Sequence, residues 1–294
     1  MFKFQTTQRK ACIGGTEFGG QPGQRRTVMV GSLFYPRHSV VLDPRTGALD
    51  HHKLTERLHQ YRKVIESCEC PSALMLYAEN ETAARNYLEA VCDIVPGPLF
   101  VDSGSSDVRI SFLRHAEEMG LRDRVVYNTI NAGLSAEEKS MLEKAPPKHA
   151  VVLAFNPRSD DVKGRIYMLE SGDDLLPQGL LETAEGLGID NLLLDVAVTS
   201  PQQNAGSALR AIMVAKAKWG LPCGCALHNA VECLDLSDMT DAKEAMRHVD
   251  SSAVALSMMA GADYVVYGPL EYAKRVMPVA AFADLMLSQS VADI

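Results

Sequence analysis

The sequence lacks the features that mark several classes of protein. Its net charge is −8, from 29 basic and 37 acidic residues, so it has no excess of Lys and Arg that would favour nucleic-acid binding. No apolar run approaches the roughly 20 residues of a membrane span. The amino-terminal segment MFKFQTTQRK has no apolar signal-peptide core. We therefore expect a cytoplasmic protein with no membrane span and no nucleic-acid partner.

Cysteine is scarce and irregularly spaced. Seven Cys among 294 residues are too few for a disulfide scaffold in a chain of this length, so we expect reduced thiols. Cys223 and Cys225, with His228, could be imagined as a thiolate metal site, because strand alternation puts both thiols on one face. No fourth ligand is evident. Buried, inert thiols are the simpler interpretation, and we expect no metal.

Repeated strand and helix patterns dominate the rest of the chain. From Thr27 onward, short runs of β-branched and apolar residues alternate with longer stretches of helical period. Eight runs predict strands, at residues 27–34, 73–78, 98–102, 124–128, 150–155, 191–195, 221–227 and 263–268. Several are almost uniformly apolar, as expected where helices cover one side and packed barrel layers the other. The count favours an α/β protein with a closed (β/α)8 barrel, and residues 1–294 as one domain.

The segments between and before these strands give further expectations. Residues 107–120 have Asp107 near the start and Gly120 at the stop, as a helix does. The segment before the first strand carries five glycines between positions 14 and 23, and we interpret it as a hairpin that plugs the barrel's N-terminal end. Residues 156–172 are predicted as a long connection between the fifth strand and its helix, and such loops often bind or cover ligands.

Polar residues end several of the predicted strands. They are Glu79 and Asn80, Asp102 and Ser103, Asn128 and Asn131, Asn156, Asp195, and His228 and Asn229. Taken singly, each could simply begin a turn or cap a helix. In this fold, however, chemistry lies at the C-terminal ends of the strands. Together these residues would form a ring of carboxylates and carboxamides around one mouth, with hardly any Lys, Arg or Cys among them.

A ring of this composition suits a neutral ligand edge with alternating donors and acceptors. A pterin has such an edge. Its N3–H and 2-amino groups are adjacent donors that one carboxylate can accept in bidentate fashion, while carboxamides can serve O4, N5 and N8. The strand ends therefore indicate a small-molecule site of the pterin type.

The motifs and their order closely resemble the family of the H subunit of tetrahydromethanopterin S-methyltransferase and its stand-alone relatives. The resemblance rests on TVMVGSLFY, FVDSGSSDVRI, VVYNTIN, VVLAFNP, LLLDVAV, GCALHNA and VVYGPLE, and it covers nearly the whole chain. It implies a pterin-binding barrel, distantly related to dihydropteroate synthase, in which Asp102, Asn128 and Asp195 hold the pterin and Asn229 contacts its N5 region. Ser103 and Asn156 complete the expected pterin contacts. Asp195 and Asn229 are the expected catalytic residues.

The resemblance also implies an activity. The stand-alone relatives are methylcorrinoid:tetrahydrofolate methyltransferases that act beside corrinoid proteins in the anaerobic demethylation of compounds such as glycine betaine. We expect methyl transfer between a methylated corrinoid and N5 of tetrahydrofolate, giving 5-methyltetrahydrofolate and cob(I)alamin. The corrinoid would arrive on a partner protein, because DHHKLT at residues 50–55 lacks the Gly of the Asp-x-His-x-x-Gly motif of corrinoid carriers. Related barrels suggest a homodimer.

Three alternatives stay open. Tetrahydromethanopterin could replace tetrahydrofolate as the methyl carrier. A synthase of the dihydropteroate type would need a diphosphate site. No clear Lys or Arg anchor for a diphosphate lies near the last two strands, and this argues against such a synthase. A non-catalytic pterin-binding subunit would use the same residues. In the long connection, Arg158, Lys163 and Arg165 could meet the glutamate tail of a folate, although a charged loop is more often merely solvated.

Overall fold

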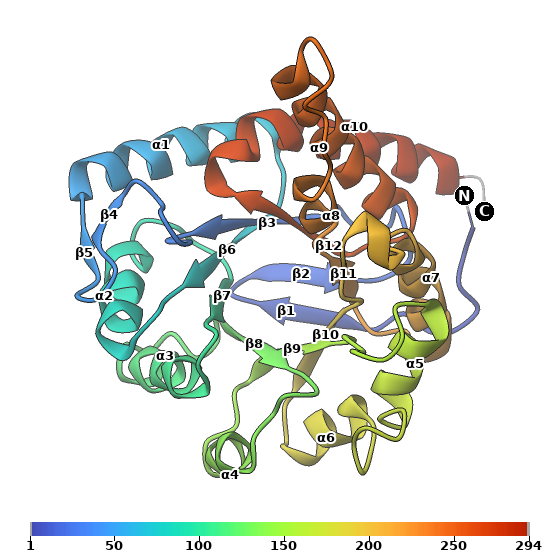
Figure 1. Cartoon of the computed structure of the whole chain (residues 1–294), viewed down its shortest axis with the longest axis horizontal. Helices are drawn as coiled ribbons and strands as arrows, with labels where there is room; N and C mark the ends of the chain where they lie inside the picture. The colour runs from blue at the N-terminus through green and yellow to red at the C-terminus, as the bar shows by residue number, and fades with distance from the viewer. Residues whose placement is uncertain (1, 293–294) are drawn as a thin grey trace.

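Eight parallel strands close into a barrel in the computed structural model of the chain, which describes residues 2–292 (Figure 1). In barrel order they are β3 (Val28–Leu33), β6 (Ser72–Tyr77), β7 (Leu99–Asp102), β8 (Val125–Ile130), β9 (His149–Leu153), β10 (Asn191–Asp195), β11 (Cys223–Cys225) and β12 (Tyr264–Pro269). Each coincides with one predicted strand, so the (β/α)8 barrel is confirmed. β11 is shorter than predicted because the chain already turns at Ala226, whose carbonyl accepts from the Asn229 N–H.

Helices follow the strands and form the outer layer of the barrel. They are α1 (His51–Cys68), α2 (Glu81–Val91), α3 (Ser106–Glu118), α4 (Ala136–Lys144), α5 (Val162–Glu170), α6 (Leu180–Gly186), α7 (Ser207–Trp219), α8 (His228–Glu232), α9 (Ala242–Met259) and α10 (Ala273–Val291), with the 3-10 turns η1 (Pro201–Gln203) and η2 (Leu270–Tyr272). The helix predicted at 107–120 is α3, and Gly120 after it has the left-handed φ of 69° that favours glycine. Within residues 2–292, no helix has both the length and the hydropathy that crossing a bilayer requires.

The connection after β9 differs from the long loop predicted at 156–172. α5 occupies Val162–Glu170, which leaves a short loop before it, and a second helix, α6, follows. Asp161 starts α5 by accepting a hydrogen bond from the Gly164 N–H at 2.7 Å. The prediction was wrong because this helix is short and contains a glycine, so its helical period is weak.

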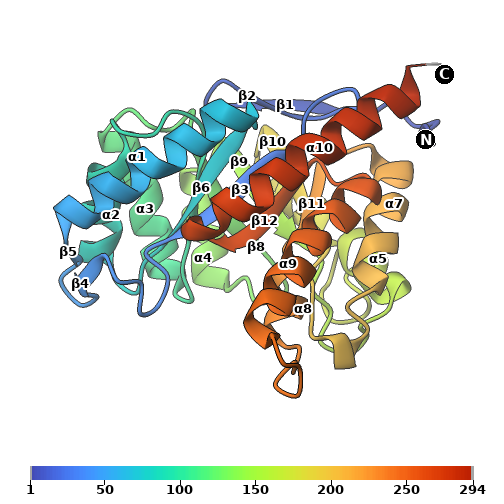
Figure 2. The same ribbon diagram turned by 90° about the horizontal axis from the view of Figure 1, so that it is seen from above.

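A hairpin closes one end of the barrel, as predicted. It consists of β1 (Lys10–Ile13) and β2 (Thr16–Gly19), and Figure 2 shows it at the end opposite the α8–α9 connection. Its Gly14 N–H donates to the carbonyl of Asp123, which precedes β8, so the hairpin lies at the N-terminal end of the strands. Three of its side chains extend the inner core of the barrel, namely Ala11, Ile13 and Phe18.

Because the hairpin fills this end, shortening a core side chain on it should destabilise the whole barrel. Ile13 is fully buried, and we expect Ile13→Val to lower the free energy of unfolding by about 1 kcal/mol. Urea unfolding followed by circular dichroism measures the change. Cys12→Ser, at the exposed neighbouring position, is the matched control. If both variants lowered the free energy of unfolding equally, the assignment of the hairpin as the plug of the barrel would be contradicted.

Candidate functional site at the barrel mouth

Strand alternation brings the predicted pterin residues to the C-terminal mouth. Asp102, Asn128 and Asp195 each lie two positions beyond an inner-core residue of the same strand, namely Phe100, Val126 and Leu193. Side chains two residues apart in a strand point to the same face. The three residues therefore form the layer directly above the inner core, at the end of the barrel opposite the hairpin.

Asp195 ends β10 with one carboxylate oxygen committed to the protein. The Ala197 N–H donates to Oδ1 at 2.8 Å, and Ala197 itself adopts a left-handed φ of 54°. Within residues 2–292, Oδ2 has no hydrogen-bond partner. Burial raises the pKa of Asp195 to about 6, against the lowering effect of the Ala197 hydrogen bond. A ligand that donates to this carboxylate would favour its charged form.

Asp102 and Asn128 are neighbours on adjacent strands. They are register partners across β7 and β8, and the Asn128 side chain donates a hydrogen bond to the Asp102 carboxylate. Burial raises the pKa of Asp102, while the Arg109 charge and the Asn128 hydrogen bond oppose the shift. On the other side, Tyr77 is the register partner of Asp102 across β6 and β7. The mouth therefore carries an acidic group at Asp102 between a carboxamide and a phenol.

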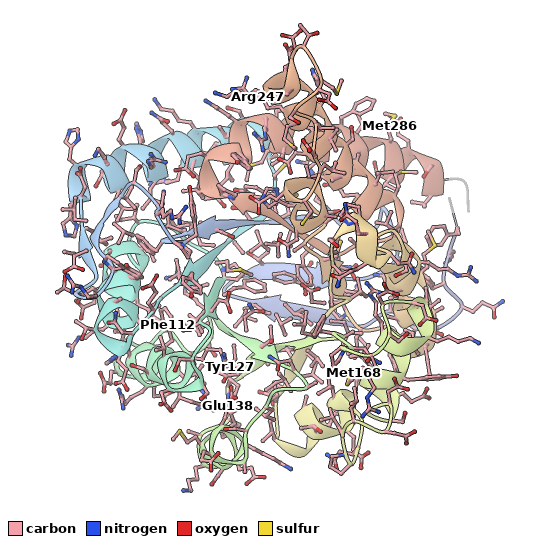
Figure 3. The ribbon with its side chains drawn as sticks, viewed as in Figure 1. Phe112, Tyr127, Glu138, Met168, Arg247 and Met286 are labelled. Atoms are coloured by element: carbon pink, nitrogen blue, oxygen red, sulfur yellow. The ribbon has the colours of Figure 1, made fainter. Side chains whose placement is uncertain are left out.

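A buried arginine on α3 supports the Asp102 side of the mouth. Arg109 donates to the Ser103 carbonyl at 2.6 Å and to Oε1 of Glu138 at 2.6 Å. Its Nε also reaches the Tyr127 hydroxyl at 3.2 Å, and Tyr127 hydrogen-bonds the same Glu138 oxygen. Figure 3 shows Tyr127 and Glu138 close together beside β8 and α4. This network fixes the backbone that follows Asp102.

A second buried arginine supports the Asp195 side. Arg165 on α5 donates through Nε to the carbonyls of Val196 at 2.8 Å and Ala197 at 3.1 Å, and through a terminal nitrogen to Ser207 Oγ at 2.6 Å. It is 2% exposed. The suggestion that Arg165 meets a folate tail is therefore wrong, because its guanidinium is occupied inside the protein. It holds the turn that presents the Ala197 N–H to Asp195.

We expect Arg165→Lys to loosen this turn. The single ammonium group of Lys cannot replace a planar guanidinium that donates to several acceptors, so buried carbonyls would lose their hydrogen-bond partners. The free energy of unfolding should fall by about 2 kcal/mol, and pterin affinity should fall about threefold through misplacement of Asp195. Chemical denaturation and calorimetry measure the two effects. Lys163→Ala, at an exposed position of the same helix, should change neither quantity. A free energy of unfolding in Arg165→Lys as high as that of the wild type would contradict the assignment.

Asn229 occupies a different setting from the three strand-end residues. It lies in the first turn of α8 and is exposed, whereas its neighbour His228 is buried. Nδ1 of His228 lies 2.8 Å from Oδ1 of Asp250, and Arg275 holds the other oxygen of that carboxylate. Although burial favours the neutral acid, these two partners keep the pKa of Asp250 below its usual range. The His228 anchor fixes the segment from which Asn229 projects.

The other two predicted pterin contacts have local roles already. Ser103 is buried, and its hydroxyl accepts from the Ser105 N–H at 3.2 Å. The amide nitrogen of Asn156 donates to the Gly164 carbonyl and to Asp173, while its oxygen accepts from the Arg158 N–H at 2.9 Å. Both residues shape loops at the mouth. A pterin contact from either one stays a prediction and would require these bonds to be shared or exchanged.

The two thiols of β11 are buried. Cys223 and Cys225 are fully buried on the outer face of β11, and burial raises the pKa of Cys225 to about 12. The nearby His228 already pairs with Asp250. Among residues 2–292, no group of three or more His, Cys, Asp or Glu side chains is arranged to hold a metal ion.

The supporting residues were not found from the sequence. Arg109 lies on the buried face of α3, among Val108, Ser111, Phe112 and Ala116. A charged residue on a mostly apolar helical face was the available signal, since it requires buried partners. The Ser103 carbonyl is a local partner just before α3, whereas Glu138 lies 29 residues away and becomes a neighbour only in the folded barrel.

Comparisons with known proteins give matches over nearly the whole chain. Residues 6–294 match the family described as the tetrahydromethanopterin S-methyltransferase MtrH subunit. The chain is 37% identical to the H subunit of tetrahydromethanopterin S-methyltransferase from Methanothermobacter thermautotrophicus, and 34% identical to the H subunit of a putative mtx methyltransferase from Methanosarcina mazei. Each alignment covers 100% of this chain and 96% of the relative.

Solved structures show the same fold. The dihydropteroate synthase of Yersinia pestis, in complex with a sulfonamide drug, has a TM-score of 0.63 at 13% identity, over 96% of this chain and 100% of that one. The dihydropteroate synthase of Thermus thermophilus has a TM-score of 0.60 at 19% identity, over 91% and 96%. The chain therefore has the barrel fold of the dihydropteroate synthases, and it belongs to the MtrH family of tetrahydromethanopterin S-methyltransferase subunits.

Proposed function

We propose that this protein transfers a methyl group between a corrinoid, carried by a partner protein, and N5 of tetrahydrofolate. The observation that carries the proposal is the Asp195 carboxylate. It is half-buried at the mouth with one oxygen free of protein partners among the described residues, and Asp102 and Asn128 belong to the same layer. A carboxylate in this state suits the adjacent N3–H and 2-amino donors of a pterin. The methyltransferase family supplies the reaction class.

The protein's part in the reaction is to bind and orient the carrier. The methyl group leaves cobalt without its bonding electrons, the N5 lone pair forms the new bond, and the N5 proton is released. Asp195 would hold the pterin ring, and Asp102 with Asn128 would fix its opposite edge. The exposed amide of Asn229 can accept from N5–H or donate to the N5 lone pair. Alignment of N5 with the methyl group accounts for most of the catalysis.

A partner would bring the corrinoid to the mouth. The sequence DHHKLT at residues 50–55 serves instead as the start of α1, where Asp50 accepts a hydrogen bond from the Lys53 N–H at 3.1 Å. Relatives of this chain are subunits of a larger methyltransferase. Their name also favours tetrahydromethanopterin as a second candidate carrier, which shares the pterin head that Asp195 would bind.

An anaerobic absorbance assay tests the proposal. Purified protein is mixed with methylcobalamin and tetrahydrofolate, and loss of the methyl-cobalt absorption is followed together with formation of 5-methyltetrahydrofolate. We expect demethylation that depends on both protein and carrier. The same assay with tetrahydromethanopterin compares the two carriers. No reaction with either carrier, combined with no pterin binding by calorimetry, would contradict the proposal, whereas binding without turnover would favour a non-catalytic role.

A further inference from the structure

Beside the mouth lies a pocket that shares only Tyr77 with the site described above. Its volume is about 410 Å³, and its walls include Phe34, Tyr35, Arg37, Tyr77, Glu79 and Tyr87. This volume lies in the range of about 300–1,000 Å³ that small-molecule sites occupy. Four of its eleven lining residues are Phe or Tyr, so the pocket suits a flat, unsaturated ring.

Tyr77 connects the pocket to the mouth. It is the register partner of Asp102, and adjacent strands lie about 4.8 Å apart. Burial, and then the charges of Glu79 and Asp102, raise the pKa of Tyr77, and Tyr77 lines the pocket together with Glu79. Glu79 belongs to the pocket and Asp102 to the pterin layer. A group joined to a pterin by a short linker can therefore reach the pocket.

Several contacts hold the loop after β3 in a defined shape. Phe34 and Arg37 adopt left-handed φ values of 62° and 67°, which are unfavourable for such residues. His38 holds this loop, because its Nδ1 accepts from the Phe34 N–H at 3.1 Å while Nε2 lies 2.9 Å from Oε1 of Glu271. Tyr35 also reaches Glu271, at 3.3 Å. Strained backbone held by such anchors is typical of a binding loop.

The pocket walls are paired aromatic rings with a cation at the rim. Phe34 stacks on Tyr87 with ring centroids 4.1 Å apart, and Tyr35 stacks on His38 at 4.4 Å. Arg37 is exposed and makes no ion pair within the described part of the chain. It could therefore pair with an anion that extends beyond a bound ring.

We propose that this pocket binds the arylamine group that follows the pterin in the methyl carrier, with Tyr35 as a wall of the site and Arg37 facing the anionic tail. The inference rests on the proposed function, since it assumes that the pterin head lies on Asp195 and Asp102. It assigns carrier selection to the loop after β3.

Two ligands distinguish binding in the pocket from binding at the pterin site. Calorimetry under anaerobic conditions compares tetrahydrofolate with 6-methyltetrahydropterin, which has the pterin head and no arylamine. Wild-type protein should bind tetrahydrofolate more tightly. Tyr35→Ala should weaken tetrahydrofolate binding about fivefold and leave the truncated pterin unchanged, while Tyr35→Phe should retain most of the affinity because the ring remains. Tyr167→Ala, at an exposed tyrosine on α5, is the matched control.

A second variant tests the pocket without changing the backbone conformation of the loop. Arg37→Asn removes the charge, and Asn tolerates the left-handed backbone, so tetrahydrofolate should bind about threefold more weakly with no change in melting temperature. Equal affinity of wild-type protein for the two ligands would overturn the subsite and leave the proposed function standing. Equal weakening of both ligands by Tyr35→Ala would also overturn it. Failure of both ligands to bind wild-type protein would overturn the proposed function and the subsite together.

Discussion

Replacing Asp195 by Asn is expected to weaken pterin binding by at least about 100-fold, because an amide nitrogen would then face the ring's N3–H and 2-amino donors. The change preserves the size of the side chain, so loss of binding reports on chemistry rather than on packing. Calorimetry with tetrahydrofolate measures it. Asp190→Asn, at an exposed position just before the same strand, should bind normally. Wild-type affinity in Asp195→Asn would remove the carboxylate from the site.

The same carboxylate predicts how binding depends on pH. The pKa of Asp195 is about 6 in the protein without ligand, and only the ionised form can accept both pterin donors. Pterin affinity should therefore be constant above about pH 7 and fall as the pH is lowered through 6. In Asp195→Asn the remaining affinity should lose this dependence. Calorimetric titrations between about pH 5 and pH 8 test the difference.

Folding stability should change in the opposite direction. Because the folded pKa of about 6 lies above the ordinary value of 3.8, the folded protein holds this proton more tightly than the unfolded chain. The stability that this proton contributes is complete below about pH 4 and is lost as the pH rises through about 6. Asp195→Asn should therefore be more stable than the wild type by about 2–3 kcal/mol at neutral pH and nearly equal to it at about pH 4. A variant destabilised at both pH values would contradict this account.

The fold was predictable because its main signal is local. Each of the eight strands is an apolar run of a few residues between turn residues, and their number alone separates a closed barrel from an open sheet. The hairpin could also be predicted, from the glycines at its turn. α5 was missed because nine residues with Gly164 inside give too little helical period. Its start depends on the Asp161 cap, which resembles an ordinary turn in the sequence.

The site was predictable only in outline. The position of Asp102 and Asp195 at strand ends places them in one layer, and this follows from topology. Their surroundings do not follow from the sequence. Arg165 contacts Val196 from 31 residues away, and a charged residue in an apparent loop gave no sign of its burial. Long-range hydrogen bonds of this kind become visible only when the barrel is closed.

Asn229→Ala should separate catalysis from binding. Its amide is exposed beside the mouth and would meet N5, where charge changes during methyl transfer, so its removal should act mainly on the transition state. We expect the rate at saturating tetrahydrofolate to fall about 100-fold, while the dissociation constant changes less than about threefold. The methylcobalamin assay gives the rate, and calorimetry gives the affinity.

The expected ratio of the two effects makes Asn229→Ala a test of mechanism as well as of position. Cys233→Ala is the matched control, since Cys233 is exposed at the end of the same short helix and should change neither quantity. If Asn229 only held the pterin, its loss would raise the dissociation constant by the same factor as it lowers the efficiency, with the saturated rate unchanged. If the amide instead orients N5 toward the methyl group, the loss appears in the saturated rate, because misalignment remains after the pterin is bound.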